Sequence, residues 1–570
     1  MCEAMIHRGP DFGRVTAAGP IVLGHRRLSI IDLSINAAQP MQSDDGRYFI
    51  VYNGEVYNFM ALRKRLVEAG CRFRTHSDTE VVLYAYILWG RKCVEEFNGM
   101  FALAIWDARG QELFLARDHF GKKPLYYHLT DAGISFASEL SALACDGEVP
   151  RKPSMEALNC YLALGYILAP LTLYEGVQML EPGTSLTVSK VNRRGTMVRY
   201  WDFASAFEKK TAEGEDEIAQ HLLLHIDGAV KARMVSDVPV GAFLSGGVDS
   251  ASVVALMKKH HAGPLLTFSM GFDEESYNEL PDAARAARWF GTEHHEQVVR
   301  CDSRESMDRA LDAYDEPFAD TSLIPTVALS RLASTHVKVA LSGDGADELF
   351  AGYITYTADR LHRFARRIPA MVLRSLGILC AAGGSHAVQK MDWRYKAKQF
   401  LAGAAESPEK AHYMWRLIFS PEERMAILGE KHRDLIYDTD PFHRFARHYG
   451  RVRELHWLDK NLYVDCMTWL PNDILVKVDR ASMRSSLETR SPYLDVSVAS
   501  YAASIPAALK MKGSKKKYIL KKALADVLPP FVLEKKKEGF SAPVGRWIGA
   551  EGVDEYKSFN RYVFGKKVKL

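Results

Sequence analysis

The sequence predicts two domains of different fold class: a layered α+β domain over residues 1–205 and an α/β domain with a doubly wound parallel sheet over residues 206–570. Two observations lead to this prediction. Short segments rich in Ile, Val, Tyr and Phe fill the first 140 residues, whereas apolar strands and helical segments alternate after residue 238. A chain of 570 residues is also too long for a single hydrophobic core.

Strands covered by helices predict the layered N-terminal domain. Two helices are expected where apolar residues recur at helical spacing, at Phe59–Glu68 and Glu80–Trp89. Residues 107–110 suit a hairpin turn between two strands. A last strand at Val198–Asp202 precedes the domain boundary. The other predicted strands are Ile21–Leu33, Tyr48–Asn53, Met100–Trp106, Leu113–Arg117 and Ile134–Ala137.

Alternating strands and helices predict the parallel sheet of the second domain, because parallel strands need helical crossovers. Ligands of such sheets bind at the carboxyl ends of the strands. The predicted strands are Val240–Leu244, Leu265–Phe272, Glu293–Val299 and Val337–Leu341. The predicted helices are Glu217–Met234, Ala251–His260, Asp282–Phe290 and Ile324–Ser334.

A glycine loop, Ser245-Gly246-Gly247-Val248-Asp249-Ser250, follows the first of these strands and opens a helix. Free backbone N–H groups and the positive end of the helix dipole make such a turn an anion site. Its glycines let the backbone approach phosphate oxygens, and Ser245 and Ser250 add hydroxyl donors. Asp249 would repel phosphate unless it binds the loop itself or Mg²⁺. The Walker spacing is absent. The alternative is a tight strand–helix turn that needs glycine for structure alone.

A second glycine loop, Ser342-Gly343-Asp344-Gly345-Ala346-Asp347-Glu348, follows the last predicted strand. Three carboxylates surround its glycines. An acidic first turn of a helix is common and needs no ligand. Two glycine loops at strand ends of one sheet nevertheless favour a shared binding site.

Composition excludes several classes of protein. The net charge is +4, from 74 basic and 70 acidic residues, too balanced to imply binding to nucleic acid or to a membrane. The eight cysteines contain no Cys-x-x-Cys pair, so we expect reduced thiols. The N-terminus lacks a signal-peptide pattern. The longest apolar stretch, Ile368–Ala382, is too short to cross a bilayer. We expect a cytoplasmic protein acting on small molecules, with a homodimer as one option.

The second domain contains six motifs that occur in this order: SGGVDS, DEPFAD (Asp315–Asp320), LSGDGADELFAGY, LPNDILVKVDR, ETRSPYLD and KEGFS. The first resembles the loop of the N-type ATP pyrophosphatases, and together they resemble the asparagine synthetase family of the glutamine-hydrolysing type. The resemblance implies a catalytic lysine at Lys537, an acidic residue near the acceptor at Asp344, and Mg²⁺ at Asp249 and Asp347. It also implies an ATP site made by Leu244, Ser245, Gly246, Gly247, Asp249, Ser250, Met270, Ser342 and Gly343.

The N-terminal domain resembles the class II glutamine amidotransferase domain, with its αββα fold of the N-terminal-nucleophile type. The motifs are HRGPD at residues 7–11, Arg27 in HRRLS, the Asn-Gly-Glu of residues 53–55, and Ser77-Asp78. By that resemblance Arg27 holds the glutamine carboxylate, Asn53 and Gly54 form the oxyanion hole, Glu55 belongs to the same glutamine-binding motif, and Asp78 holds the amino group. A bidentate guanidinium suits a carboxylate, and amide N–H groups suit an oxyanion.

Cys2 departs from the pattern of that family. The family's nucleophile is a cysteine that becomes residue 1 and is followed by a strand and a helix before HRGPD. Here His7 follows Cys2 by only five positions, and Cys2–Ile6 resembles the end of that helix. We expect that Cys2 is not the nucleophile, that the first strand is missing, and that the chain uses free ammonia. A compressed but working N-terminus is the rival interpretation.

The resemblance implies ATP-dependent amide synthesis, in which aspartate is adenylated and ammonia from glutamine gives asparagine, AMP, pyrophosphate and glutamate. Glutamine hydrolysis is expected to be impaired. Three alternatives stay open. The acceptor could be another carboxylate, such as a sugar acid, a peptide or a β-lactam precursor. The chain could be a non-catalytic relative. It could also be a nucleotide- or tRNA-modifying pyrophosphatase, which the front half and the lack of Cys-x-x-Cys disfavour.

Overall fold

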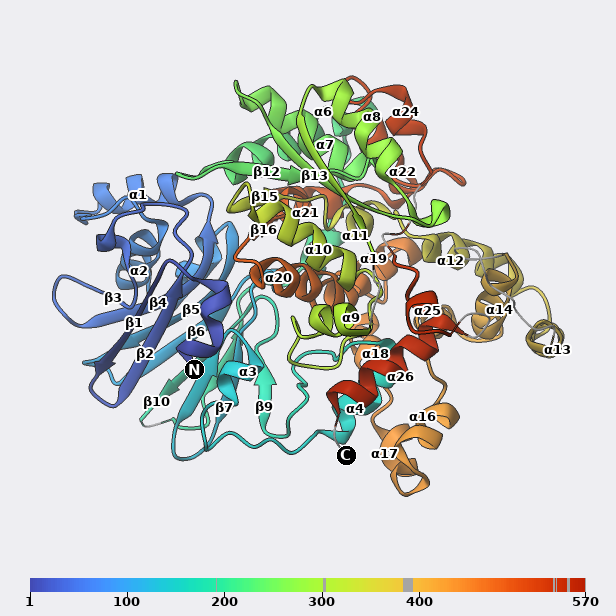
Figure 1. Ribbon diagram of the computed structural model, residues 1–570, viewed down its shortest axis with the longest axis horizontal. Coiled ribbons are helices and arrows are strands. Elements are labelled where there is room, and N and C mark those ends of the chain that lie inside the picture. The colour runs from blue at the N-terminus through green and yellow to red at the C-terminus, as the bar shows by residue number, and fades with distance from the viewer. Residues whose placement is uncertain are drawn as a thin grey trace.

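The N-terminal strands and the C-terminal parallel sheet belong to two domains that pack side by side (Figure 1). The computed structural model describes residues 1–190, 192–300, 304–382, 393–536, 539, 541–550 and 554–568. No helix within these ranges combines the length and the apolar character needed to cross a bilayer. Six cysteines in the part of the chain that the structure describes are free thiols: Cys2, Cys71, Cys93, Cys145, Cys160 and Cys466.

One layer of the N-terminal domain is a six-stranded antiparallel sheet in the order β11-β10-β6-β5-β4-β3. Successive side chains of a strand point to opposite faces. Ile50 and Tyr52 of β4 (Tyr48–Val56) therefore pack on two helices, whereas Phe49 and Val51 face the second layer. The predicted helices are confirmed as α1 (Phe59–Glu68) and α2 (Asp78–Trp89). The strands are β3 (Met41–Gln42), β4 (Tyr48–Val56), β5 (Gly99–Asp107), β6 (Glu112–Arg117), β10 (Thr184–Ser189) and β11 (Thr196–Arg199).

The second layer consists of two separate pieces. One is the hairpin of β1 (Phe12–Ala18) and β2 (Ile21–Arg27), and the other is a three-stranded sheet in the order β8-β7-β9. Within the described residues, no strand pairs with the outer edge of β2 or of β8. The strands of the second piece are β7 (Tyr126–Leu129), β8 (Ile134–Ala137) and β9 (Val177–Met179).

Two strand predictions in this half were wrong at their ends. The strand predicted at Ile21–Leu33 ends at Arg27, because the Arg27 guanidinium donates hydrogen bonds to the carbonyls of Asp32 and Ser34 and draws the following loop back onto the strand end. The strand predicted at Val198–Asp202 is shifted to Thr196–Arg199, where it pairs with β10.

The C-terminal sheet is parallel throughout, in the order β14-β13-β12-β15-β16, which confirms the doubly wound prediction. Its central strand, β12, leads into the first glycine loop. Its two neighbours are β13, which contains Met270, and β15, which leads into the second glycine loop. One strand, Glu488–Arg490, was missed because it has only three residues and all of them are polar. They are buried, and Arg490 Nε donates to Glu488 at 2.8 Å. The strands are β12 (Val240–Phe243), β13 (Leu266–Phe272), β14 (Glu293–Val299), β15 (Val339–Leu341) and β16 (Glu488–Arg490).

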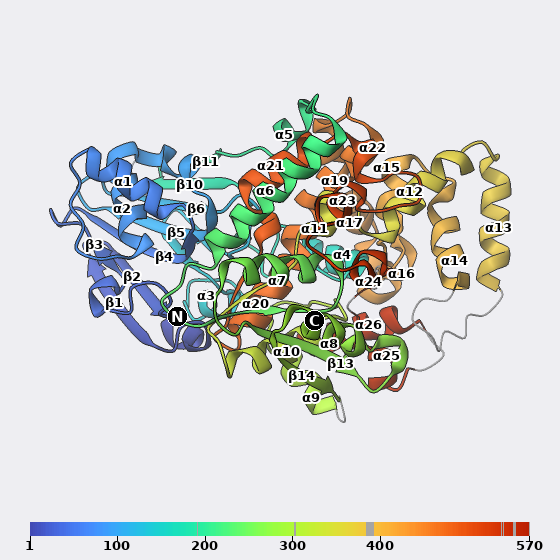
Figure 2. The same cartoon turned by 90° about the horizontal axis from the view of Figure 1, so that it is seen from above.

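Helices cover both faces of this sheet and extend the domain away from the N-terminal layers (Figure 1). Those next to the strands are α6 (Glu215–Arg233), α7 (Val248–His260), α8 (Leu280–Phe290), α10 (Leu323–Ser334), α20 (Leu475–Met483) and α21 (Val496–Ser504). Figure 2 shows two further helices at the far end of the molecule, α13 (Ala370–Ala382) and α14 (Trp393–Ala404). The other α-helices between Ile354 and Met467 are α12 (Ile354–Ala365), α15 (Pro408–Met414), α16 (Pro421–Leu428), α17 (Arg433–Asp438), α18 (Phe442–Arg451) and α19 (Trp457–Met467).

Buried charges join the two domains. Arg8, from the HRGPD motif, makes two hydrogen bonds of 2.9 and 3.1 Å to Asp479 of α20. Lys123 approaches the same carboxylate at 3.3 Å. Next to them Arg480 pairs with Glu139 at 2.9 Å. Burial disfavours the charged carboxylate, yet Arg8 and Lys123 hold the pKa of Asp479 below its usual range. The contact between the domains therefore depends on completed charge pairs in a dry interior.

We expect Asp479→Asn to destabilise the fold strongly, because it leaves the buried Arg8 and Lys123 without their shared counter-charge. Breaking a buried pair costs about 3–5 kcal/mol. Scanning calorimetry should show a clear fall in the unfolding temperature. Asp273→Asn is the matched control, since Asp273 and its partner Arg300 are 59% and 64% exposed, and such surface pairs contribute about 0–1 kcal/mol. Equal, small shifts in the two variants would contradict the role given to Asp479.

Candidate functional site

The first glycine loop connects β12 to α7 at the carboxyl edge of the sheet. Gly246 has φ of +71°, and a Cβ there would lie 2.7 Å from the backbone of Asp282, so only glycine fits. Ser250 Oγ accepts a hydrogen bond of 3.0 Å from the Ser245 backbone N–H. Gly247 caps the amino end of α7. The loop thus presents a helix amino terminus to the space beyond the strand, as an anion site requires.

The second glycine loop lies against the first, because their strands β12 and β15 are neighbours in the sheet. A Cβ on Gly343 would lie 2.8 Å from Asp249 Cβ and 2.9 Å from the Ser250 backbone nitrogen. Ser342 Oγ donates to Asp344 at 2.7 Å. The two loops, predicted separately from the sequence, therefore form one site.

Both loops line a cavity of about 350 Å³. Phe243 and Phe268 extend its apolar wall, which suits a flat base. Gly246 and Gly247 are not among the lining residues, and they shape the turn instead. The predicted residues that line the cavity are Leu244, Ser245, Asp249, Ser250, Met270, Ser342, Gly343, Asp344 and Asp347.

Asp249 and Asp347, the predicted Mg²⁺ ligands, meet at one cation. Lys517 Nζ lies 2.7 and 2.6 Å from the two oxygens of Asp249 and 2.5 Å from Asp347. One small cation can therefore reach both carboxylates. Mg²⁺ is commonly held by one or two carboxylates together with substrate phosphates, so these residues fit that ion. Within the described residues no group of three or more His, Cys, Asp or Glu side chains has metal-binding geometry.

Sequence reasoning missed several residues of this cavity. Lys477 pairs with Asp320 at 2.6 Å, and Trp469 stacks on Tyr353 with ring centroids 5.6 Å apart. Burial, and then the charge of Asp347, raise the pKa of Glu348 to about 7. Lys477, Asp320 and Glu348 lay inside the recognised motifs, which could have drawn attention to them. Lys517 lay in a run of lysines with no other signal.

Lys537, the catalytic residue that the resemblance implies, lies outside the described residues. Of the residues near it in sequence, Gly539 lines the cavity. Lys535 donates a hydrogen bond to the Ser245 carbonyl at 3.4 Å and pairs with Asp282 at 2.7 Å. The part of the chain that follows α24 (Pro530–Glu534) therefore reaches the first glycine loop.

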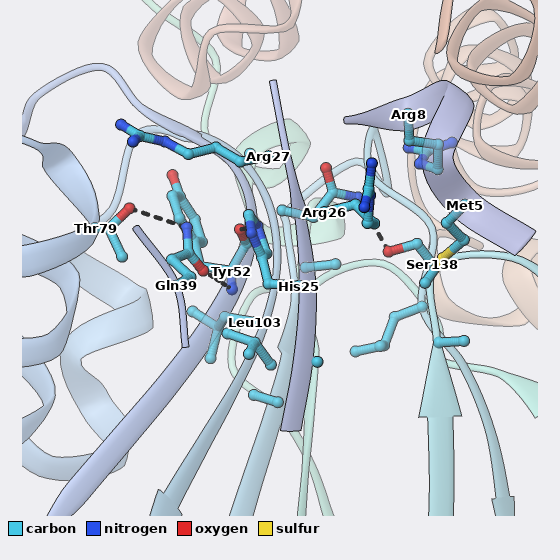
Figure 3. Close-up of a pocket in the computed structure, with 18 of the residues that line it drawn as sticks. Met5, Arg8, His25, Arg26, Arg27, Gln39, Tyr52, Thr79, Leu103 and Ser138 are labelled. Atoms are coloured by element: carbon cyan, nitrogen blue, oxygen red, sulfur yellow. Dashed lines mark hydrogen bonds between the residues drawn. The ribbon is translucent and has the colours of Figure 1, made fainter. Parts of the chain in front are cut away.

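A second cavity, of about 440 Å³, lies in the N-terminal domain, and it is lined by all five predicted glutamine-binding residues: Arg27, Asn53, Gly54, Glu55 and Asp78. Figure 3 shows Arg27 and Gln39 on one side and Ser138 on the other. The side chain of Gln39, which the sequence did not single out, donates to Thr79 at 3.2 Å and accepts from the Tyr52 backbone at 2.6 Å (Figure 3). The cavity reaches between the edges of β2 and β8.

The two charged residues expected to hold glutamine are partly engaged by the protein itself. Arg27 donates to the carbonyl of Ser34 at 2.8 Å and also to that of Asp32. Asp78 accepts from Tyr52 Oη at 2.8 Å and from the Val56 backbone at 3.0 Å. Burial raises the pKa of Asp78 to about 6. A guanidinium has five N–H donors and a carboxylate about four acceptor positions, so both retain capacity for a ligand.

Asn53 and Gly54 lie on β4 where the oxyanion hole is expected. Gly54 has φ of +148°, and a Cβ would lie 2.0 Å from the Met100 carbonyl oxygen, so only glycine allows β4 and β5 to pair here. Asn53 Nδ2 donates to Ser138 at 3.3 Å. Glu55 instead lies 3.4 Å from Arg490, an arginine of the C-terminal sheet. Glu55 therefore lines the cavity and also makes a contact between the domains.

Cys2 lines the same cavity but lies in a short 3₁₀ helix, η1 (Cys2–Arg8). A Cβ on Gly24 of β2 would lie 2.4 Å from Cys2 Sγ, so the thiol rests directly on that strand. Burial raises the pKa of the Cys2 thiol, which lowers the fraction of reactive thiolate.

Helix α20 forms part of the wall of both cavities. Lys477 near its start lines the first, and Met483 at its end lines the second. Asp479 and Arg480, between them, make the buried charge pairs at the domain boundary. The two sites are therefore neighbours, separated by one helix of nine residues.

Comparison with known proteins supports both halves of this arrangement. A family model described as "Asparagine synthase" matches residues 221–557, and one described as "Glutamine amidotransferase domain" matches residues 1–201. Among relatives, the chain is 29% identical over 591 residues to a protein of Penicillium rubens named "Amidase chyE", which covers 95% of this chain and 84% of that protein.

Two relatives from Bacillus subtilis (strain 168) carry synthetase names. The chain is 30% identical over 562 residues to "Asparagine synthetase [glutamine-hydrolyzing] 3", with 95% of this chain and 83% of that protein covered. It is 34% identical over 557 residues to "Asparagine synthetase [glutamine-hydrolyzing] 1", with 97% and 84% covered. Two matching family models and this similarity along nearly the whole sequence show that the chain belongs to the asparagine synthetase family, whose members make amides with ATP and glutamine.

Proposed function

We propose that this enzyme adenylates the side-chain carboxylate of aspartate and transfers ammonia to it, giving asparagine, AMP and pyrophosphate. The observation that carries the proposal is the meeting of two glycine loops at neighbouring strand ends, with Asp249 and Asp347 directed at one cation. That arrangement suits a triphosphate. The adjoining Lys477, Glu348 and Trp469 leave room for an acceptor in the same cavity.

The chemistry follows from the poor leaving group of a carboxylate. A carboxylate oxygen attacks the α-phosphorus of ATP, the bond to the bridging oxygen breaks, and pyrophosphate leaves with the electron pair. Ammonia then attacks the acyl carbon and AMP leaves. Lys537 is assigned to the growing charge on the α-phosphate. Mg²⁺ held by Asp249 and Asp347 would supply further charge stabilisation. Glu348, with its pKa of about 7, is suited to take the proton that nitrogen loses.

The N-terminal cavity is assigned to glutamine, with Arg27 on the carboxylate, Asp78 on the amino group, and Asn53 with Gly54 as the oxyanion hole. The raised pKa of the Cys2 thiol supports impaired hydrolysis, with free ammonia as the nitrogen source. The free thiols fit a reducing compartment such as the cytoplasm.

A second candidate function differs only in the acceptor. The relative named as an amidase favours another carboxylate, such as a sugar acid, a peptide or a β-lactam precursor. The stacked Trp469 and Tyr353 offer a flat apolar wall for a larger acceptor. Pyrophosphate release with a panel of carboxylates, ammonium and ATP decides between these functions. Aspartate is expected to give the fastest pyrophosphate release. A carboxylate that gives faster release would replace aspartate as the proposed acceptor.

Lys537→Ala should leave ATP affinity nearly intact and slow pyrophosphate release by about 10²–10³-fold, because it removes a charge that acts mainly in the transition state. Rapid-quench measurement with ATP, aspartate and ammonium checks this. Lys536→Ala is the matched control, since Lys536 is its exposed neighbour in sequence. Unchanged release in the Lys537 variant would remove that residue from the mechanism.

Ammonium should support amide synthesis while glutamine does not, and Cys2→Ala should leave the ammonium-dependent rate unchanged. The reason is that a largely protonated thiol in a 3₁₀ helix is a poor nucleophile. Glutamate formation is measured beside pyrophosphate release. A robust glutaminase rate that Cys2→Ala abolishes would establish Cys2 as the nucleophile and overturn this part of the proposal.

Glutamine affinity should fall as pH drops below about 6, by about tenfold per pH unit, because Asp78 with its pKa of about 6 becomes neutral while the glutamine ammonium keeps its charge. Calorimetric titration with glutamine from pH 5 to pH 8 tests this range. Asp78→Asn should bind weakly at every pH and lose the dependence. A dependence that survives in Asp78→Asn would assign it to another group.

A further inference from the structure

Lys517 occupies a position that no motif assigned to it. It precedes α23 (Tyr518–Ala523), and its side chain is only 6% exposed. Its ammonium lies 2.6–2.7 Å from both oxygens of Asp249 and 2.5 Å from Asp347. The lysine therefore bridges one carboxylate from each glycine loop, although it lies 268 residues from the first in sequence.

The surroundings of Lys517 hold it in this place. Its backbone has φ of +53° and ψ of +34°, a left-handed conformation that is uncommon for lysine. Its N–H donates to the Phe350 carbonyl at 3.2 Å. A Cβ on Gly352 would lie 1.7 Å from Asp347 Oδ1 and 2.3 Å from Lys517 Cε. Glycine at that position leaves the space through which the lysine stem reaches the carboxylates.

Charge and distance decide what can share this position. Mg²⁺ binds carboxylate oxygens at about 2.0–2.1 Å. An ammonium at 2.5–2.7 Å from the same oxygens occupies acceptor positions that the metal would use, and its charge repels a second cation. Lys517 and a divalent cation therefore compete for the position between Asp249 and Asp347. When a triphosphate is present, its oxygens offer the displaced ammonium new anionic partners.

We propose that Lys517 is an exchangeable counter-ion of the nucleotide site. It neutralises Asp249 and Asp347 while no nucleotide is bound, and it transfers to phosphate oxygens when the metal–nucleotide complex takes up those carboxylates. This inference rests on the proposed function of the C-terminal cavity. Its consequence is that the enzyme binds free divalent cations weakly and takes up the metal together with ATP.

Mn²⁺ alone, without nucleotide, is the probe for the full-length chain, and electron paramagnetic resonance follows the free ion. Lys517→Asn removes the charge, and asparagine tolerates the left-handed backbone. We expect it to bind Mn²⁺ at least about tenfold more tightly than the wild type. Adding Asp249→Asn to that variant should reverse the gain. The matched control is Lys522→Asn, since Lys522 pairs with Glu215 at 2.8 Å and should not change the affinity.

Equal Mn²⁺ affinity in the wild type and in Lys517→Asn would overturn the proposal. Circular dichroism checks that the variant is folded, and Lys517→Met, which keeps most of the buried stem, is the second neutral variant. Lys517→Arg keeps the charge and should retain the weak Mn²⁺ binding of the wild type. The measurement involves neither acceptor nor turnover. A different result would contradict the proposed function, namely that no carboxylate supports pyrophosphate release by the wild-type enzyme.

Discussion

The backbone contact between the two glycine loops is the constraint on which the C-terminal site depends. Neighbouring parallel strands end side by side, so the turns that follow them must share a small space. Gly343 against the backbone at Asp249 and Ser250, and Gly246 against Asp282, leave no room for a side chain. Because the loops meet at this distance, carboxylates from both reach one cation. A larger residue at Gly343 would separate the loops and divide the site.

Buried charge is the second organising feature, and it links the two sites. Arg8 and Asp479 join the HRGPD segment to α20, and Arg490 of the C-terminal sheet reaches Glu55 of the N-terminal cavity. Charges removed from water stabilise a structure only when they are paired with good geometry. The two domains are therefore held in a defined relation, with one helix as the common wall. Such closeness suits a reaction in which neutral ammonia must avoid protonation on its way to an activated acid.

The regular elements were predicted well wherever apolar residues recur with a clear period. The helices beginning at Phe59 and Leu323, and the strand and helix on either side of the first glycine loop, followed the prediction to within a few residues. The polar strand at Glu293–Val299 was also predicted, but the three-residue strand β16 was not. The residues Glu488–Arg490 form a buried strand only because Arg490 finds carboxylates on Glu488 and Glu55. That partnership joins distant parts of the chain, so no local pattern reports it.

By itself, the sequence determined the two fold classes, the strand–loop–helix conformation of the glycine loops, and the family, because these depend on local periodicity and on motifs in a fixed order. Only the tertiary structure decided which charges meet. It brought Lys517 to Asp249 and Asp347, paired Glu55 with Arg490, and packed the Cys2 thiol against strand β2, where burial raises its pKa. Ion pairing and burial act through space between residues hundreds of positions apart, and spacing along the chain carries no record of them.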